Sequence, residues 1–117
     1  MKLLIVGSRG IKDFDLSNYV PSDTDVIISG GANGVDTLAE IYADKMKLSK
    51  IIIRPGYDLY GRAAPIKRNE IMVDMADEVL VIWDGKSKGT KYTADYATRK
   101  TKQVKIITVD GTGSDSL

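Results

Sequence analysis

The chain has 117 residues, of which 43% are hydrophobic and 28% charged, and basic residues outnumber acidic ones by one. These values are typical of one globular domain with a single core, and they argue against a strong overall attraction to nucleic acid or an anionic membrane. Cysteine and histidine are absent, which excludes disulfides, thiolate catalysis, zinc sites built from these residues and histidine-based triads.

The N-terminal half alternates short apolar runs with turn signals. Strands are predicted at residues 3–6, 25–29 and 51–53, and a helix from 35 to about 47. Leu38, Ile41 and Tyr42 recur at helical spacing and predict the apolar face of that helix. Residues 10–23 are polar and irregular, with one helical turn expected at residues 15–19.

The C-terminal half repeats the alternation. A loop is predicted at residues 56–65, followed by a helix over 65–75, a strand over 79–83, a helix over 91–100 and a strand over 104–109. Ile71, Met72 and Met75 are expected on the apolar side of the first of these helices. Residues 1–110 are predicted to form one domain and residues 111–117 a flexible tail.

Strands that alternate with helices predict an α/β fold, a Rossmann-like three-layer sandwich with about five parallel strands and helices on both faces. The first, second and fourth strands are the most uniformly apolar, so we expect them in the centre of the sheet. The first apolar run is far too short to span a membrane, and no secretory signal is visible, so a cytoplasmic protein is expected.

The glycine-rich segment SGGANGVD, residues 29–36, joins a predicted strand to a predicted helix. Its glycines, Gly30, Gly31 and Gly34, permit positive φ and leave room for backbone N–H groups to converge. A helix N-terminus adds roughly half a positive charge at the same place. This combination suits a phosphate, although a tight strand-to-helix turn without a ligand remains the alternative.

Two further strand-end loops, residues 7–10 and 84–90, should meet the first at the carboxyl edge of the sheet, where ligands of such folds bind. The second is not a Walker P-loop, because Leu80 stands where that pattern needs its first glycine. The candidate ligand-binding residues are Gly7, Ser8, Arg9, Gly30, Gly31, Ala32, Gly34, Asp36, Arg68, Asn69, Asp84, Gly85, Ser87, Gly89 and Thr90.

Arg9 and Arg68 are the candidate phosphate-binding cations, with solvent-exposed charge or a surface salt bridge as the alternative. Asp36 has two credible roles: a structural group at the helix start, or a carboxylate that points aside toward ribose hydroxyls. If the protein is an enzyme, Asp36 and Asp84 are the candidate catalytic carboxylates, together with Arg68.

Aromatic side chains near the predicted site have open roles. Tyr57 and Tyr60 could stack on a base, or cover the core edge or a subunit contact. Trp83 is expected in the core with a partly exposed edge. Tyr92 and Tyr96 lie one helical turn apart and leave room for a homodimer. No metal site is readable beyond magnesium brought in with phosphate.

With these residues in view, the chain resembles the SLOG superfamily, the Rossmann-like grouping that includes DNA-processing protein A and the Lonely Guy phosphoribohydrolases, and especially its small YspA/YpsA-like members. The matching segments cover nearly the whole chain in order: GSR at residues 7–9, SGGANGVD at 29–36, GRAAPIKRNEIM at 61–72, AD at 76–77 and WDGKSKGT at 83–90.

The resemblance implies a homodimer that binds a nucleotide or a derivative such as an ADP-ribose or NAD relative, as a sensor or carrier. Lonely Guy enzymes hydrolyse the N-glycosidic bond of nucleoside 5'-monophosphates with an arginine, matched by Arg68, and a glutamate after a glycine–threonine loop. Here that glutamate is missing, because Tyr92 and Thr93 follow Thr90 at two and three residues. Hydrolysis, single-stranded DNA binding and a purely structural domain therefore stand as alternatives.

Overall fold

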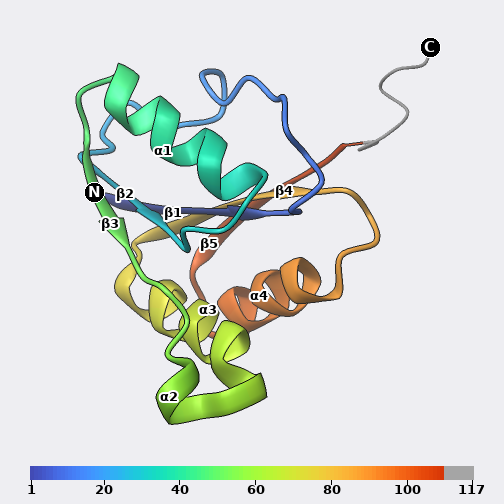
Figure 1. Ribbon diagram of the computed structural model, residues 1–117. Coiled ribbons are helices and arrows are strands. Elements are labelled where there is room, and N and C mark those ends of the chain that lie inside the picture. The colour runs from blue at the N-terminus through green and yellow to red at the C-terminus, as the bar shows by residue number, and fades with distance from the viewer. Residues whose placement is uncertain (110–117) are drawn as a thin grey trace.

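The strands and helices of the chain form a three-layer α/β sandwich in a computed structural model, which describes residues 1–109 (Figure 1). The strands are β1 (Lys2–Gly7), β2 (Val26–Ser29), β3 (Ser49–Ile52), β4 (Glu78–Trp83) and β5 (Gln103–Thr108). The helices are α1 (Val35–Lys45), α2 (Tyr57–Tyr60), α3 (Ala64–Met75) and α4 (Lys88–Arg99), with a 3₁₀ turn, η1 (Gly61–Ala63), between α2 and α3. The tail predicted at residues 111–117 lies outside the described residues.

The sheet has the strand order β3-β2-β1-β4-β5 and every pair of neighbouring strands is parallel. The predicted α/β class, and the central position of the first, second and fourth strands, are therefore confirmed. After β3 the chain crosses back over β2 and β1 to form β4, so the direction of strand addition reverses between β1 and β4. The two halves of such a sheet carry their helices on opposite faces because each crossover is right-handed.

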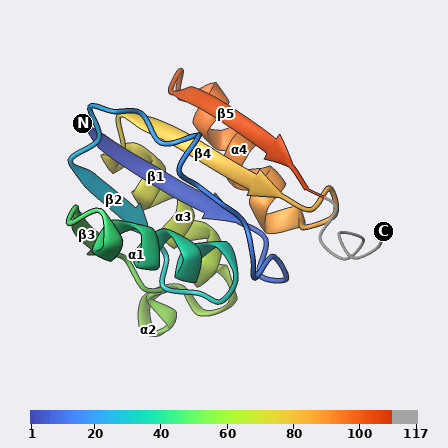
Figure 2. The same ribbon diagram turned by 90° about the horizontal axis from the view of Figure 1, so that it is seen from above.

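The sheet lies between α1 on one side and α3 and α4 on the other (Figure 2), and each of its faces has its own apolar core. Side chains alternate along β1, so that Leu3 and Ile5 pack toward α1 while Leu4 and Val6 pack toward α3 and α4. The irregular segment between β1 and β2 lies on the α1 side and completes that layer with Ile11. The sheet is thus buried on both faces, which explains why its central strands are continuously apolar.

The apolar faces predicted for two helices are partly wrong. Ile41 of α1 is 58% exposed, and Ile71 of α3 is 42% exposed. The buried stripe of α1 instead contains small residues such as Ala39 and Ala43. Small side chains let a helix lie close to the sheet, and this need outweighs the hydrophobicity of isoleucine, which spacing alone would favour.

Three further boundaries differ from the prediction. The helical turn expected at residues 15–19 is only a turn, closed by a hydrogen bond from the Tyr19 N–H to the Leu16 carbonyl. The loop predicted at residues 56–65 contains α2 and η1. Helix α4 starts at Lys88, three residues earlier than expected, because Ser87 caps it and accepts the N–H of Thr90.

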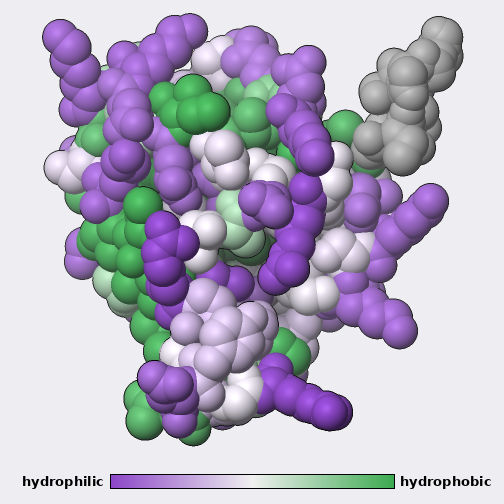
Figure 3. All heavy atoms as spheres, in the orientation of Figure 1, coloured by the Kyte–Doolittle hydropathy of each residue, from purple (hydrophilic) through white to green (hydrophobic). Residues whose placement is uncertain are grey.

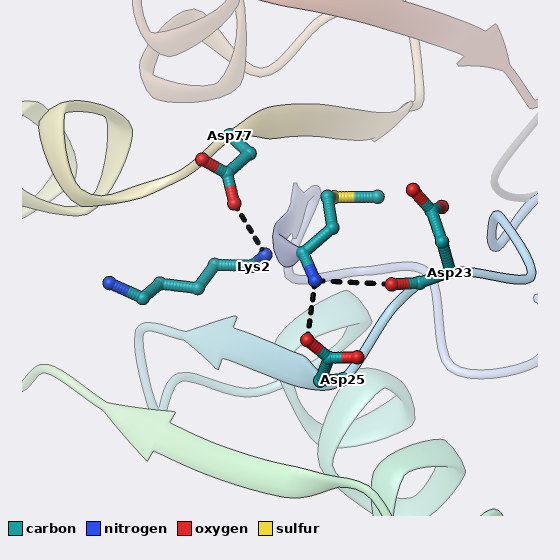
Figure 4. Close-up of polar contacts among 5 residues, drawn as sticks. Lys2, Asp23, Asp25 and Asp77 are labelled. Atoms are coloured by element: carbon teal, nitrogen blue, oxygen red, sulfur yellow. Dashed lines mark hydrogen bonds and ion pairs between the residues drawn. The ribbon is translucent and has the colours of Figure 1, made fainter.

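At the amino edge of the sheet, polar groups are bonded to one another (Figure 4). The amino group of Met1 donates to the Asp25 carboxylate and to the carbonyl oxygen of Asp23, while the backbone N–H of Lys2 donates to Asp77 at 2.7 Å. These contacts tie the starts of β1, β2 and β4 together. Within residues 1–109, no helix is both long and apolar enough to cross a membrane.

Candidate functional site

A cavity of about 420 Å³ opens at the carboxyl edge of the sheet, where the strand order reverses between β1 and β4. Figure 3 shows a hollow near the middle of the face in view, with hydrophilic side chains around it. The cavity is lined by Val6, Gly7, Arg9, Gly10, Ala32, Asp36, Pro65, Ile66, Arg68, Asn69, Asp84, Ser87, Gly89 and Thr90. The three strand-end loops and the start of α3 therefore meet around one space.

A second cavity, of about 470 Å³, lies near the starts of β1, β4 and β5, so volume alone does not single out the carboxyl edge. The distinction comes from the polar atoms. Among the described residues, only Thr24 Oγ1 and Asp36 Oδ1 are buried side-chain oxygens without a hydrogen-bond partner. Asp36 lines the carboxyl-edge cavity, whereas Thr24 lines neither cavity. We therefore take the carboxyl-edge cavity as the candidate site.

The first glycine loop uses several of its N–H groups internally. The N–H of Gly31 donates to Ser29 Oγ at 3.2 Å, and that of Ala32 donates to Asp36 Oδ2 at 3.1 Å. The N–H of Val35 donates to the Ser8 carbonyl oxygen at 3.3 Å. Fewer N–H groups of this loop are therefore free to bind a phosphate than its glycine content indicates.

Two glycines of this loop are required by close packing. Gly34 has a φ of +75°, and a Cβ there would lie 2.4 Å from the carbonyl oxygen of Arg9. A Cβ on Gly30 would lie 2.7 Å from Arg68 Nη1 and 2.9 Å from Asp36 Oδ2. Gly34 thus lets the first two strand-end loops touch, while Gly30 leaves the space that the two charged side chains occupy.

Arg68 lies in the second turn of α3, and its side chain is only 6% exposed. Nη1 donates to the carbonyl oxygens of Gly30, at 2.5 Å, and Ile53, at 3.4 Å. Burial lowers the pKa of the guanidinium, against the opposing charge of Asp36, but arginine stays protonated at neutral pH. Nη2 bonds to none of the described residues.

Asp36 lies in the first turn of α1 and is 5% exposed. Burial raises the pKa of its carboxyl above the ordinary value, although the N–H of Ala32 and the guanidinium of Arg68 both act in the opposite direction. One oxygen, Oδ2, caps the glycine loop through Ala32, and the other, Oδ1, has no partner. The structural role predicted for Asp36 is therefore present and uses only half of the carboxylate.

A chain of side-chain hydrogen bonds joins Arg68 to the start of α4. Asn69 accepts from Arg68 Nε at 2.8 Å and donates to Thr93 Oγ1 at 2.8 Å. Thr93 in turn donates to the carbonyl oxygen of Gly89 at 2.9 Å. Because Arg68 also bonds to Gly30, this chain connects the first glycine loop to the loop that starts α4. Asn69 thus holds the orientation of the guanidinium.

The loop between β4 and α4 is organised by Asp84. Its Oδ1 accepts the N–H groups of Lys86 and Ser87, both at 2.8 Å, and these bonds lower the pKa of the carboxyl. The backbone N–H of Asp84 donates to Ser8 Oγ at 3.0 Å, which ties this loop to the end of β1. Asp84 therefore acts as a turn-forming residue, and it is a poor candidate for a catalytic base because its carboxylate is already stabilised.

Most of the predicted ligand-binding residues line the cavity, and a few do not. Gly30 and Gly31 line an adjoining space of about 250 Å³, which shares Arg9, Ala32 and Arg68 with the main cavity. Ser8, Gly34 and Gly85 line neither space. Sequence reasoning missed Val6, Gly10, Pro65 and Ile66 as lining residues. Gly10 lies within the strand-end loop at residues 7–10, and Pro65 and Ile66 lie within the segment at 61–72, so their neighbourhood was visible. Val6 carried only a strand signal.

The tyrosines do not line the cavity. Tyr57 and Tyr60 belong to α2, are exposed and line neither space. Tyr92 and Tyr96 of α4 donate to Glu70 and Asp74 of α3, so the hydroxyl groups proposed at a dimer face bridge two helices of the same chain. The indole N–H of Trp83 donates to the Ser87 carbonyl oxygen at 2.9 Å and supports the α4 loop.

Within residues 1–109, no group of three or more acidic side chains is placed to hold a metal ion. The chain matches no protein-family model, and no curated protein or solved structure matches it. The site must therefore be interpreted from its own geometry.

Proposed function

We propose that this protein binds a nucleotide or a nucleotide derivative, such as an ADP-ribose or NAD relative, in the carboxyl-edge cavity. The observation that carries the proposal is the juxtaposition of two buried, incompletely bonded charged groups, Arg68 and Asp36, in one cavity. Buried charged groups in a cleft are characteristic of functional sites. Their burial costs desolvation free energy, and contact with a ligand can offset that cost.

The dimensions and chemistry of the cavity fit such a ligand. A volume of about 420 Å³ falls within the range of roughly 300–1,000 Å³ that is usual for small-molecule sites. Arg68 Nη2 and the exposed Arg9 supply positive charge for a phosphate. The first turn of α4, with Gly89 and Thr90 at the wall, adds a helix N-terminus to the same space.

The resemblance of the sequence motifs to the SLOG grouping supports the same ligand class. Binding is favoured over hydrolysis because the positions where the Lonely Guy glutamate would stand serve other purposes here. Tyr92 bonds to Glu70, and Thr93 belongs to the hydrogen-bond chain from Arg68. A sensor or carrier role follows.

Hydrolysis of an N-glycosidic bond is the second candidate, and the raised pKa of Asp36 favours it. A carboxyl whose pKa is raised by burial keeps its proton to a higher pH than a solvent-exposed one does, which suits a general acid. Asp84 does not have this property, because its pKa is lowered by backbone N–H groups. If the protein is an enzyme, we therefore assign the acid–base role to Asp36 alone.

The test is a thermal-shift screen of the purified protein against AMP, ADP, ADP-ribose, NAD and inorganic phosphate. A ligand present at about a hundred times its dissociation constant adds roughly 2.7 kcal/mol of stability, which is readily detected. We expect a shift with at least one nucleotide, and a loss of about 100-fold in affinity for it in Arg68→Met.

Arg62→Met is the matched control, because Arg62 is exposed on η1 and lines no part of the cavity. It should bind the same nucleotide as the wild type does. The absence of a shift with every compound, or equal losses in the two arginine variants, would refute the proposal. Chromatography of the bound nucleotide after prolonged incubation distinguishes binding from slow hydrolysis.

A further inference from the structure

Asp36 Oδ1 is a hydrogen-bond acceptor that the fold buries without using. Every other buried side-chain nitrogen or oxygen among the described residues, apart from Thr24 Oγ1, has a partner. An unpaired buried acceptor costs about 1–3 kcal/mol, and more when it is charged. Because Asp36 lines the cavity, a ligand in this space lies next to the residue that carries the unpaired oxygen.

The donor that fits Oδ1 must be neutral or positive, since a phosphate would be repelled by the carboxylate. It must also lie close to an anionic group of the same ligand. A Cβ on Gly30 would lie 2.7 Å from Arg68 Nη1 and 2.9 Å from Asp36 Oδ2, so the guanidinium and the carboxylate are close together, and a ligand that contacts both groups must carry its anion near its donor. In a nucleotide, the sugar hydroxyls are nearer to the phosphate than the amino groups of the base are.

We infer that Asp36 accepts a hydrogen bond from a sugar hydroxyl, so that the site selects ribose phosphates over their deoxy counterparts. The inference rests on the proposed function. It states that one oxygen, Asp36 Oδ1, determines whether the site prefers ribonucleotides or deoxyribonucleotides. Asp36 Oδ2 keeps its bond to the N–H of Ala32 when the ligand is bound, so the loop need not rearrange.

The fixed position of Asp36 strengthens this selectivity. Asp36 is buried in the first turn of α1, and Gly30 packs against its carboxylate. An acceptor held this firmly cannot turn toward water when the hydroxyl is absent. A deoxy ligand therefore leaves the acceptor buried and unpaired, and rejection of a ligand that lacks one hydrogen-bonding group is strongest in this situation.

The experiment compares AMP, 2'-deoxy-AMP and 3'-deoxy-AMP by calorimetric titration of the wild-type protein. We expect at least one deoxy compound to bind about 10- to 100-fold more weakly than AMP. In Asp36→Asn and in Asp36→Ala, that ratio should fall to within about threefold. Asparagine preserves the bond from Ala32, so this variant stays folded even if the alanine variant does not.

Asp95→Asn is the matched control, because Asp95 is exposed on α4, pairs with Lys91 at 2.9 Å and lines neither the cavity nor the adjoining space. This variant should keep the wild-type preference for AMP. Equal affinity of the wild type for all three compounds would overturn the inference and leave nucleotide binding intact. Absence of binding by all three compounds would instead remove the mononucleotide site itself, and the inference with it.

Discussion

The two edges of the sheet treat their charged groups in opposite ways. At the amino edge, the Met1 amino group and the Asp25 carboxylate bond to each other while Asp25 remains 74% exposed to solvent. At the carboxyl edge, Asp36 and Arg68 are buried near each other, and each keeps a nitrogen or oxygen that bonds to no described residue. The charged groups at the amino edge are paired, whereas those at the carboxyl edge keep unpaired polar atoms.

This difference supports the proposal that the carboxyl edge is the ligand-binding edge. Exposed ion pairs contribute little to stability and involve little desolvation. Burying a carboxylate with one unpaired oxygen costs stability, and ionisable groups perturbed by burial in a cleft cluster at functional sites. The larger cavity at the amino edge has no comparable group, which is why its volume carries less weight. Four predictions test the comparison.

The largest effect is expected from Gly34→Ala, because the carboxyl edge depends on backbone contact between its loops. Gly34 has positive φ, and a Cβ would lie 2.4 Å from the Arg9 carbonyl oxygen and 2.5 Å from that of Ser8. Chemical denaturation should show a loss of about 3 kcal/mol or more. Gly61→Ala is the control, since Gly61 also has positive φ but open space around it, and about 1 kcal/mol is expected there. Equal losses would contradict the packing argument.

Asn69→Ala should have the next largest effect, because it breaks the hydrogen-bond chain from Arg68 to the start of α4. We expect a loss of about 1–2 kcal/mol in stability and about tenfold weaker AMP binding, since the guanidinium is no longer held. Tyr96→Phe removes another bond between α3 and α4, to Asp74, outside the cavity. It should leave AMP affinity unchanged. If both variants lose affinity equally, helix packing explains the result, and orientation of Arg68 does not.

Asp36→Asn should stabilise the protein at neutral pH. Because burial raises the pKa of Asp36 in the folded state, the wild type is most stable, as far as this group is concerned, below the unfolded pKa of about 4. It loses that stability as the pH rises through the folded pKa. The variant should therefore melt about 3 °C higher at pH 7 and at the same temperature as the wild type near pH 3. A lower melting temperature at pH 7 would show that pairing with Arg68 outweighs burial.

Asp25→Asn should have the smallest effect, as the amino edge is exposed. The hydrogen bond that the Met1 amino group donates to the Asp25 carboxylate raises the pKa of that amino group. Its contribution is therefore complete below the unfolded pKa near 8 and disappears as the pH rises through the folded pKa. Melting curves should show a decrease of no more than about 2 °C at pH 7 and none at pH 11. A larger loss would mean that the amino edge is not merely a surface contact.

Much of the fold was predictable because it depends on local patterns. Continuous apolar runs such as Leu3 to Val6, bounded by glycine, indicate strands buried on both faces, and their alternation with helices leads to the parallel sheet. The same reasoning placed the three strand-end loops at one edge, where they now line a common cavity. The helix faces were harder, because Ile41 and Ile71 are exposed where small alanines pack against the sheet.

The sequence predicted most of the residues that line the candidate site, but it did not predict the role of each one. Asp36 and Asp84 are equivalent in sequence, since each is an aspartate in a glycine-containing strand-end loop. Only the folded chain distinguishes them. Asp84 is saturated by the N–H groups of its own turn, whereas the remaining oxygen of Asp36 is buried beside Arg68, thirty-two residues further along the chain.

Sequence by itself determined the α/β class, the central strands and the edge at which the loops meet, because hydrophobic periodicity and glycine chemistry act over a few residues. Tertiary structure decided which polar groups are satisfied and which remain free. Burial and hydrogen-bond pairing depend on residues far apart in the chain, such as Gly30, Arg68 and Thr93, and no local pattern contains that information.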